Sequence, residues 1–455
     1  MQQQLQQRDL LENINFIEYQ LCLTEYYNLQ KTGQIIAKAS RGQKGSFHLT
    51  NRPICHHENG LRSVPIKRTV LNIERFFLKS PIEIQFAYSN IISGNINRAI
   101  LKYHSPADKS KDQYYYGKGI TTSQHIASAC FEFFEGYSAR MRSDDLLLSA
   151  SFNEVANKAI DPVLFNLAAD TTYHPAKRIE WVWGYSLSRK KSVLVPANLV
   201  FFPYEAVPGE KHIVRSDTNG LASGNNMEEA VLHGLLEIIE RDQVMISEYN
   251  RLPVKRIIPE SLPVACTPML DTLKKKGFEV YIFSGTSDLP FSFITVFLRH
   301  QKNFSTCSVS SGCHLDPVIA LERALTEAVQ MLPPVANFEG WYNSGAPQFY
   351  LASLSDAIHF DTLKNYAIDD IKENIETCLS FLDTINAEVI AVDLSQPDIP
   401  FPVVRMLATQ LQPILQRDYS RRLSSRFFEV PVKLGLRTEP ISLSAINIWP
   451  ICGYR

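Results

Sequence analysis

The sequence lacks a surplus of charge of either sign and lacks any long hydrophobic run. Lys and Arg number 46 against 47 Asp and Glu, which gives the 455 residues a formal net charge of −1. A chain without a basic surplus has no general attraction for nucleic acid or anionic lipid. Its longest apolar stretches, such as 192–202 and 291–298, are far shorter than the ~18 residues of a membrane-spanning helix. We therefore expect neither nucleic acid nor a membrane as a partner.

Paired cysteines and targeting signals are also missing. The 8 cysteines are scattered with no CxxC pair, which is typical of reduced, cytosolic proteins. The first residues, MQQQLQQRDL, lack the basic-then-apolar profile of a signal peptide. Cys55-His56-His57 contains metal-ligating residue types, but an isolated cluster of this kind is more typical of a loop. The sequence predicts a cytoplasmic protein that folds without disulfides or structural zinc.

Helix-like and strand-like patterns alternate along most of the chain, which predicts an α/β (α+β) fold with mixed sheets. The predicted helices cover 121–142, 226–248, 315–332 and 369–385. The predicted strands cover 181–187, 192–202, 278–284, 291–299 and 387–395.

We divide the chain into an N-terminal extension (1–75), a main domain (76–440) and a C-terminal tail (441–455). Within the extension, 8–31 has the apolar spacing of an amphipathic helix. The segment 39–68 is polar and rich in Gly and Pro, which is typical of a linker or long loop. The extension either binds a partner or packs on the main domain, and helical packing is the interpretation that we favour.

Three predicted helices carry an unusual polar face. With about 100° between successive residues, each helix places polar groups opposite its apolar residues. The three sets are Ser128, Glu132 and Glu135; Asn225, Glu229, Glu237 and Glu240; and Arg323, Glu327 and Gln330. An ordinary solvated face would account for any one of them. Such a face normally mixes charges, however, and no Lys stands three or four residues from any Glu of the two close pairs, Glu132/Glu135 and Glu237/Glu240.

Carboxylates that converge from three helices would repel one another by roughly several kcal/mol per close pair. Protons or divalent cations must then neutralise them, and Mg²⁺ prefers carboxylates together with substrate phosphates. The three faces taken together therefore favour a Mg²⁺ site with a phosphate ligand over three separate solvated faces.

Nucleotide-binding loops of the common kinds are absent. The sequence contains neither a GxxxxGK[ST] loop nor a GxGxxG turn, and no GxSxG nucleophile motif. Lys118, between two glycines before a predicted helix, is a candidate phosphate contact, although a surface turn is the more frequent explanation of this pattern. The loop 216–226 leads into the second acidic helix and is rich in backbone donors. His233 lies on the Glu face, where it is either a general base or, as we favour, a hydrogen-bonded structural histidine.

Four of these stretches resemble the YcaO family. They are 117–135 (GKG…SACFEFFE), 216–242 (S…NGLASGNNMEEAVLHGLLEIIERD), 311–330 (SGCHLDPVIALERALTEAVQ) and 393–407 (DLSQPDIPFPVVRML). Together they run through about 80–430. The resemblance implies a YcaO-type α/β domain that binds ATP and Mg²⁺ through carboxylates on several helices, without a Walker motif.

The resemblance also implies roles for individual residues. The expected nucleotide-binding residues are Lys118, Ser128, Asn225, Arg323 and Gln330, and the expected metal ligands are Glu132, Glu135, Glu229, Glu237, Glu240 and Glu327. Two features depart from the family pattern. Gly136 stands where many members have Arg, and the C-terminal sequence NIWPICGYR has a single proline where azoline-forming members often have a Pro-x-Pro-x-Pro tail.

The chemistry implied by the resemblance is ATP-dependent activation of a backbone amide in a ribosomally synthesised precursor peptide. Cyclodehydration of Cys, Ser or Thr to an azoline is the expected outcome. Thioamide formation with a sulfur-delivery partner, amidine formation and a non-catalytic scaffold role stay open as alternatives. The sequence has no four-cysteine zinc pattern and no E1-like half, so we expect a separate leader-peptide-binding or E1-like partner protein. A homodimer is compatible with the sequence.

Overall fold

The computed structural model describes residues 3–5, 47–55, 60–92, 96–104, 112–142, 145–168, 171–204, 213–214, 216–304, 306–332, 346–414 and 423–442. The predicted helix at 8–31, His56, His57 and the tail beyond residue 442 lie outside these ranges. Every cysteine within them is free. No helix within them is long and apolar enough to cross a membrane.

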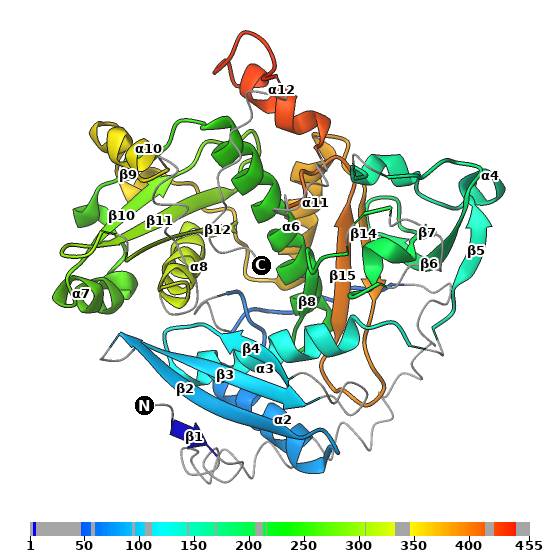
Figure 1. Ribbon diagram of the computed structural model, residues 1–455, viewed down its shortest axis with the longest axis horizontal. Helices are drawn as coiled ribbons and strands as arrows, with labels where there is room; N and C mark the ends of the chain where they lie inside the picture. Colours follow the sequence, from blue (N-terminus) through cyan, green and yellow to red (C-terminus); the bar gives the residue numbers. More distant parts are fainter. Residues whose placement is uncertain are drawn as a thin grey trace.

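The described residues form three sheets arranged around the middle of the molecule (Figure 1). The first has the order β1 (Gln3–Leu5), β2 (Ile84–Ile92), β3 (Ile96–His104), β4 (Asp112–Gly117). The second has the order β12 (Cys307–His314), β11 (Ser292–His300), β10 (Phe278–Ser284), β9 (Lys255–Ile257), β13 (Ala357–Ile358). The third has the order β5 (Leu148–Ser151), β6 (Arg178–Ser186), β14 (Val389–Asp393), β15 (Val403–Ala408), β8 (Leu221–Ser223), and β7 (Lys191–Pro196) also pairs with β6.

Helices pack on these sheets and on one another. They are α2 (Ile66–Lys79), α3 (Thr122–Ser138), α4 (Phe152–Val155), α5 (Ala197–Val200), α6 (Met227–Asn250), α7 (Thr267–Lys275), α8 (Pro317–Gln330), α10 (Ala346–Ala352), α11 (Ile371–Asp383) and α12 (Ser425–Lys433). Helix α3 packs on β3 and β4, α8 packs on β11 and β12, and α6 contacts β8, β15 and β12. This mixture of helices and sheets confirms the predicted fold class.

Local sequence fixes where the three acidic helices begin. Thr121 and Gln124 form a reciprocal capping box at the start of α3. The Asn226 side chain accepts a hydrogen bond from Glu229 N at the start of α6, at 3.0 Å. Asp316 caps α8, whose first residue is a proline. Each helix therefore begins within two residues of the position predicted from the sequence.

One predicted strand is wrong in its second half. The segment 192–202 was expected to be a single strand, but β7 ends at Pro196 and the chain turns into the short helix α5. A proline has no backbone N–H to donate to the ladder, so a strand readily ends there. The next residues are buried and, apart from Asn198, apolar, and for this reason the sequence resembles one longer strand.

The core between α2 and α3 is aromatic. Phe77 of α2 stacks on Phe134 of α3 with ring centroids 5.8 Å apart, and Phe134 stacks on Phe401 at 5.0 Å. Val70 and Ile73 of α2 are buried in the same cluster. Helix α2 spans residues 66–79, so the predicted boundary at 75/76 lies within a helix whose apolar face belongs to this core. The division into extension and main domain stays a prediction.

Candidate nucleotide and metal site

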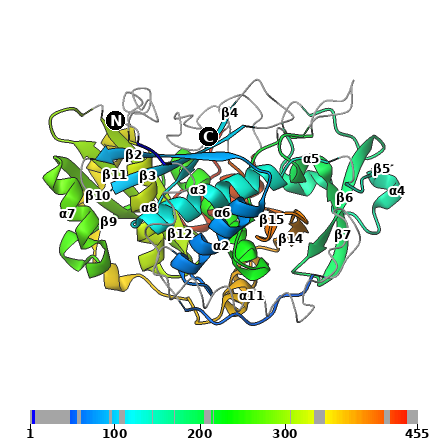
Figure 2. The same cartoon turned by 90° about the horizontal axis from the view of Figure 1, so that it is seen from below.

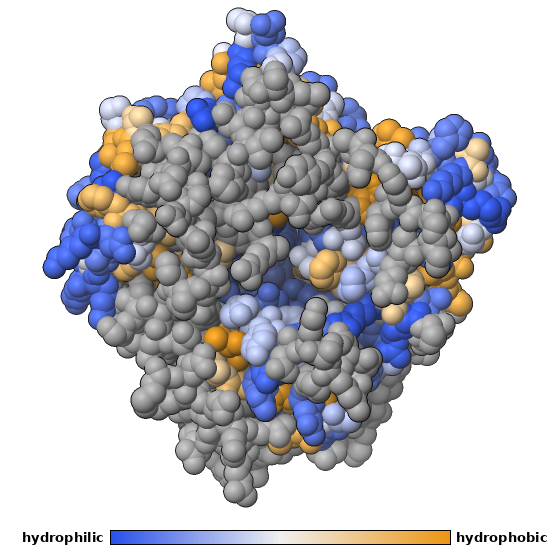
Figure 3. Space-filling model, in the orientation of Figure 1, coloured by the Kyte–Doolittle hydropathy of each residue, from blue (hydrophilic) through white to orange (hydrophobic). Residues whose placement is uncertain are grey.

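The three acidic helices meet at the middle of the molecule. Helices α3, α6 and α8 lie around the middle of the molecule in two perpendicular views (Figures 1 and 2), and the space-filling view shows a hollow lined by hydrophilic residues there (Figure 3). Two glycines permit this arrangement. A Cβ on Gly117 of β4 would lie 1.8 Å from His125 O of α3, and one on Gly312 of β12 would lie 2.2 Å from Ala320 O of α8. Each helix therefore contacts its strand backbone to backbone.

The carboxylates of α3 reach across to two other elements. Glu132 Oε2 accepts a hydrogen bond from Tyr116 N of β4 at 2.6 Å. Glu135 Oε1 accepts two hydrogen bonds from Ser223 of β8, one from N at 2.9 Å and one from Oγ at 2.8 Å. The α3 face that the sequence singled out thus points into the space between β4 and β8.

The carboxylates of α6 lie beside a cation that the sequence reasoning overlooked. Arg241 Nη2 is 3.0 Å from Glu237 Oε1, and Arg241 Nη1 is 3.4 Å from Glu240 Oε1. The observation that no Lys accompanies these glutamates was correct, but an Arg stands four residues after Glu237, at the spacing that forms ion pairs on a helix. Glu240 also accepts from Cys313 N at 3.2 Å, and Gly220 N donates to Glu237 at 3.3 Å.

The Gly-Lys-Gly turn ties α3 to α8. Lys118 Nζ forms an ion pair with Glu327 of α8, and Lys118 N donates to Ser128 Oγ of α3 at 3.2 Å. Gln330 Nε2 donates to Tyr116 O at 3.1 Å, one turn after Glu327. The turn thus brings three of the predicted nucleotide-binding residues next to one another.

Mutual repulsion shows that these carboxylates share one electrostatic environment. Burial is the main cause that raises the pKa of Glu135 to about 8; the charges of Glu237 and Glu132 add to the rise, and the Ser223 hydrogen bonds oppose it. Glu132 is exposed to solvent on one side, but protein atoms crowd its carboxylate, and this loss of solvation raises its pKa to about 7. The charge of Glu327 contributes to the same rise.

Helix α8 contributes Arg323 and Glu327, and both charges act on Glu240 of α6. Burial raises the pKa of Glu240, with Glu327 adding to the rise and Arg241 and Arg323 opposing it. Burial also disfavours ionisation of Glu327, yet Lys118 and then Arg241 hold its pKa below the ordinary value. Glu327 is therefore the carboxylate whose charge is already neutralised by protein cations.

Glu229 and Asn225 form a neighbouring group at the first turn of α6. Glu229 is buried and accepts from Ser63 N at 2.9 Å and Ser63 Oγ at 2.7 Å. Its other oxygen accepts from Asn225 N at 3.1 Å and from Asn225 Nδ2 at 2.8 Å, with Arg62 Nη1 at 3.6 Å. As placed, both oxygens of Glu229 are occupied by protein donors: Asn225, just before α6, and Ser63 and Arg62 of the segment before α2, which was expected to be only a linker.

His233 lies among cations. Burial holds its pKa well below the ordinary value, and the charges of Arg323, Arg62 and Lys118 lower it further. His233 is therefore neutral at neutral pH. The low pKa makes the imidazole a weak base, which is in keeping with the structural interpretation that we favoured for it.

Gly136, the departure from the family pattern, has a steric explanation. A Cβ at this position of α3 would lie 2.9 Å from Cε1 of Tyr115 on β4. That tyrosine ring packs edge-on against Phe133, with ring centroids 5.6 Å apart. In this chain a tyrosine occupies the space that a longer residue at 136 would need.

The chemistry of these side chains fits Mg²⁺ with a phosphate ligand. The clustered carboxylates Glu132, Glu135, Glu237, Glu240 and Glu327 are hard oxygen donors, and fewer cationic side chains, Lys118, Arg241 and Arg323, compensate them. Burial is the main cause of the raised pKa values and repulsion between the carboxylates adds to it, and a divalent cation would favour the charged form of these groups. Within the described ranges, Arg323 Nε is a buried donor without a hydrogen-bond partner.

As placed in the structure, the clustered carboxylates are not arranged as a metal site. In the part of the chain that the structure describes, no three Glu, Asp, His or Cys side chains are grouped so that they could hold a metal ion. The ion pairs of Lys118 with Glu327 and of Arg241 with Glu237 keep these carboxylates engaged. Metal binding would require at least one of these pairs to open.

Comparison with known proteins agrees with this chemistry. The family described as "YcaO cyclodehydratase, ATP- and Mg²⁺-binding" matches residues 116–412. A protein of Methanothermobacter thermautotrophicus without an assigned function is 30% identical over 323 residues, which cover 66% of this chain and 81% of that protein. All the predicted site residues fall within the matched family region.

Two solved structures share the fold. A heterocyclase in complex with substrate and cofactor superposes with a TM-score of 0.80 at 23% identity, covering 90% of this chain and 59% of the heterocyclase. YcaO from Methanopyrus kandleri, bound with AMPPCP and Mg²⁺, superposes with a TM-score of 0.65 at 24% identity, covering 79% of this chain and 95% of that one. These similarities establish the architecture around the three acidic helices.

Proposed function

Because this chain belongs to the YcaO family, we propose that it uses ATP and Mg²⁺ to activate a backbone amide of a ribosomally synthesised peptide, with cyclodehydration of Cys, Ser or Thr to an azoline as the outcome. The family region is an ATP- and Mg²⁺-binding domain. The observation that carries the proposal is the cluster of carboxylates with raised pKa values facing Lys118 and Arg323. The heterocyclase whose fold covers 90% of this chain supports the choice of product.

Magnesium-bound ATP, when present, supplies the phosphoryl group that turns the amide oxygen into a leaving group. Glu132, Glu135, Glu237 and Glu240 would hold the metal, and Lys118 would exchange Glu327 for a phosphate oxygen. The buried Nε of Arg323 offers a further donor to the phosphates. This task is positioning and charge neutralisation, which needs no covalent nucleophile.

Over the whole reaction the peptide loses one water. The side-chain thiol or hydroxyl adds to the amide carbon and loses its proton, and the amide oxygen departs on inorganic phosphate. The amide nitrogen loses its proton as the C=N bond of the azoline forms. Thioamide formation would differ because sulfur from a donor would replace the amide oxygen.

We also propose that peptide recognition is shared with a separate leader-binding or E1-like partner. The sequence of 455 residues contains no four-cysteine zinc pattern. The partner would deliver a precursor peptide to the hollow between α3, α6 and α8.

The proposal is tested by following the carbonyl oxygen of the peptide backbone with an isotope label. The protein is incubated with ATP, Mg²⁺ and a pool of Cys-, Ser- and Thr-containing peptides that carry heavy oxygen in their backbone carbonyls. Amide activation predicts heavy oxygen in the released phosphate and peptides that have lost one water. A different outcome would indicate thioamide formation instead of cyclodehydration: the released phosphate carries heavy oxygen and, when a sulfide source is added, the peptides exchange an oxygen for a sulfur. ATP hydrolysis that leaves all label in the peptides would contradict amide activation altogether.

A matched pair of variants makes this assay specific. Glu240→Gln removes a buried carboxylate inside the cluster, whereas Glu248→Gln makes the same change two turns later on α6, where the carboxylate accepts from Tyr350 Oη. Label transfer should be lost in the first variant and kept in the second.

A further inference from the structure

The loop before α6 holds three of the clustered or neighbouring carboxylates. Gly220 N donates to Glu237, at 3.3 Å. Ser223 donates to Glu135 through both N and Oγ, at 2.9 and 2.8 Å. Asn225 donates to Glu229 through both N and Nδ2. One segment, residues 216–226, which includes β8, therefore donates hydrogen bonds to carboxylates that come from two different helices.

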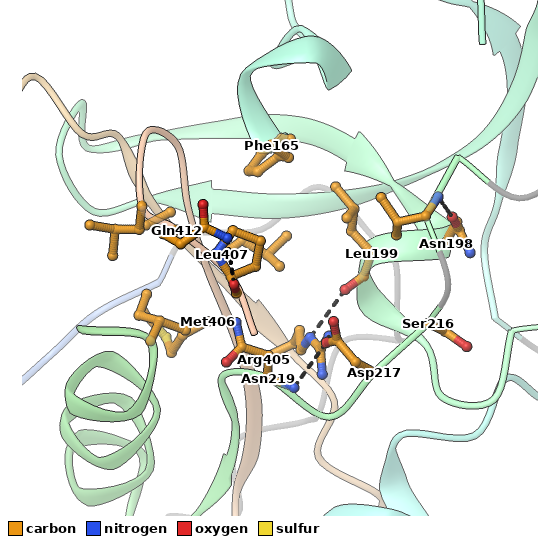
Figure 4. Close-up of a pocket in the computed structure, with 15 residues that line it drawn as sticks. Phe165, Asn198, Leu199, Ser216, Asp217, Asn219, Arg405, Met406, Leu407 and Gln412 are labelled. Carbon is orange, nitrogen blue, oxygen red and sulfur yellow. Dashed lines mark hydrogen bonds and ion pairs between the residues drawn. The ribbon is translucent and has the colours of Figure 1, made fainter. Parts of the chain in front are cut away.

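A buried ion pair holds the start of this loop. Asp217 Oδ1 accepts from Arg405 Nη2 of β15 at 2.8 Å, and their side chains are 9% and 4% exposed. The same oxygen accepts from Asn219 N at 3.0 Å, and Arg405 Nε donates to Leu199 O at 3.1 Å. Figure 4 shows Arg405 between Asp217 and Leu199, with Asn219 beneath them. The pair joins β15, α5 and the loop at one point.

The backbone after this point has little freedom. Gly220 has a φ of +77°, and a Cβ there would lie 2.2 Å from Met406 O. Met406 N donates to Gly220 O at 2.7 Å, and Arg405 is the register partner of Leu221. The position of the Gly220 N–H, and hence of Glu237, therefore follows from how the ion pair fixes residues 217–219.

The pair borders a cavity of about 40 Å³. Within the described ranges, Arg405 Nη1 and Asn219 Oδ1 are buried and have no hydrogen-bond partner, and both residues line this cavity. A space of this size whose mixed wall includes unpaired polar atoms suits a few water molecules. Since apolar residues often replace buried ion pairs without loss of stability, the value of this pair lies in the geometry that it imposes.

We infer that Asp217 and Arg405 are positioning residues of the metal site, which act by fixing the turn whose Gly220 N–H donates to Glu237, a glutamate of the same cluster as Glu135. The inference rests on the proposed function, because it takes these glutamates as Mg²⁺ ligands. Neither residue contacts the metal or the nucleotide in this scheme.

The test measures Mg²⁺ binding directly, by calorimetry with AMPPCP as the nucleotide probe, in wild type, Asp217→Asn, Arg405→Lys and a control, Asp288→Asn. The control makes the same change in another buried pair, in which Asp288 Oδ1 is 2.9 Å from Arg426 Nη2. Residues that orient metal ligands typically change metal affinity by about 10- to 100-fold. We expect the Mg²⁺ concentration for half-saturation to rise about 10-fold or more in Asp217→Asn, and less in Arg405→Lys, which keeps the charge.

Thermal unfolding of the same proteins without Mg²⁺ separates positioning from general damage. Asp217→Asn and Asp288→Asn should both lower the unfolding temperature, but only Asp217→Asn should weaken Mg²⁺ binding. Equal Mg²⁺ affinities in Asp217→Asn and wild type would overturn the inference, and so would an equal weakening in Asp288→Asn. Should Asp217→Asn not fold, the same comparison is made with Arg405→Lys. A wild type that binds AMPPCP without any dependence on Mg²⁺ would overturn the proposed function itself.

Discussion

Replacing Glu135 by Gln should stabilise the Mg²⁺-free protein. Gln has the size of Glu, and its side-chain oxygen can still accept the hydrogen bonds from Ser223 N and Oγ. It removes the charge that burial disfavours and that Glu237 and Glu132 repel. Glu135, as a proposed metal ligand, would thus lower the free energy of unfolding as long as the metal is absent.

The pKa of Glu135 sets the size and the sign of this effect. In the unfolded chain the carboxyl ionises near 4.5, whereas in the folded protein its pKa is about 8. The folded state therefore holds a proton that the unfolded state releases, and stability is lost as pH rises from the lower value to the higher. At pH 7 the loss is about 2 to 3 kcal/mol, after allowance for the partial opening of Glu135 to the cleft. Glu135→Gln avoids this loss.

Urea unfolding in the presence of a chelator, at pH values from about 4.5 to about 8, measures the difference. The variant and wild type should have nearly equal stability at the acidic end, and the variant should gain an advantage as pH rises. Glu248→Gln is the matched control, because burial raises the pKa of Glu248 to about 7. It should show a similar pH-dependent advantage while Mg²⁺-dependent nucleotide binding persists. A Glu135→Gln protein less stable than wild type near pH 7, or an advantage that does not grow with pH, would refute the reasoning.

Two further predictions follow from the contacts of the site. Lys118→Ala removes a proposed phosphate contact, so calorimetry should show that AMPPCP affinity falls at least about tenfold. It also removes the cation that lowers the pKa of Glu327, so the free protein should bind more protons near neutral pH. Unchanged affinity would exclude Lys118 from the nucleotide site. Gly136→Arg, which introduces the residue that the family resemblance implies at this position, should destabilise the protein by about 1 to 3 kcal/mol because its Cβ would lie 2.9 Å from the Tyr115 ring. A stability equal to wild type in urea unfolding would show that Tyr115 moves aside without cost.

Much of the fold followed from periodicity. The helices at 226–248 and 315–332 correspond to α6 and α8 because each has a capping residue at its start and an apolar stripe that a sheet covers. The end of β7 at Pro196 was missed because the apolar run continues through α5. Burial alone does not distinguish a strand from a short buried helix.

The candidate site was predictable where residues share a helix face and unpredictable where they come from distant segments. The faces of α3 and α6 singled out Glu132, Glu135 and Glu237, but no local pattern could indicate that Ser223 donates to Glu135 across 88 residues of sequence. Arg241 was visible four residues after Glu237, and a search for Arg as well as Lys would have found it. The close approach at Gly117 depends on tertiary packing alone.

The central claim is that α3, α6 and α8 together form one Mg²⁺-dependent ATP site. The most direct measurement is unfolding of the wild type and of Glu237→Ala with saturating ATP, in the presence and absence of Mg²⁺. Ligand at about a hundred times its dissociation constant adds about 2.7 kcal/mol of stability. The account predicts a stabilisation of this order in wild type that requires Mg²⁺ and disappears in Glu237→Ala. Equal stabilisation of both proteins by ATP, with or without Mg²⁺, would contradict it.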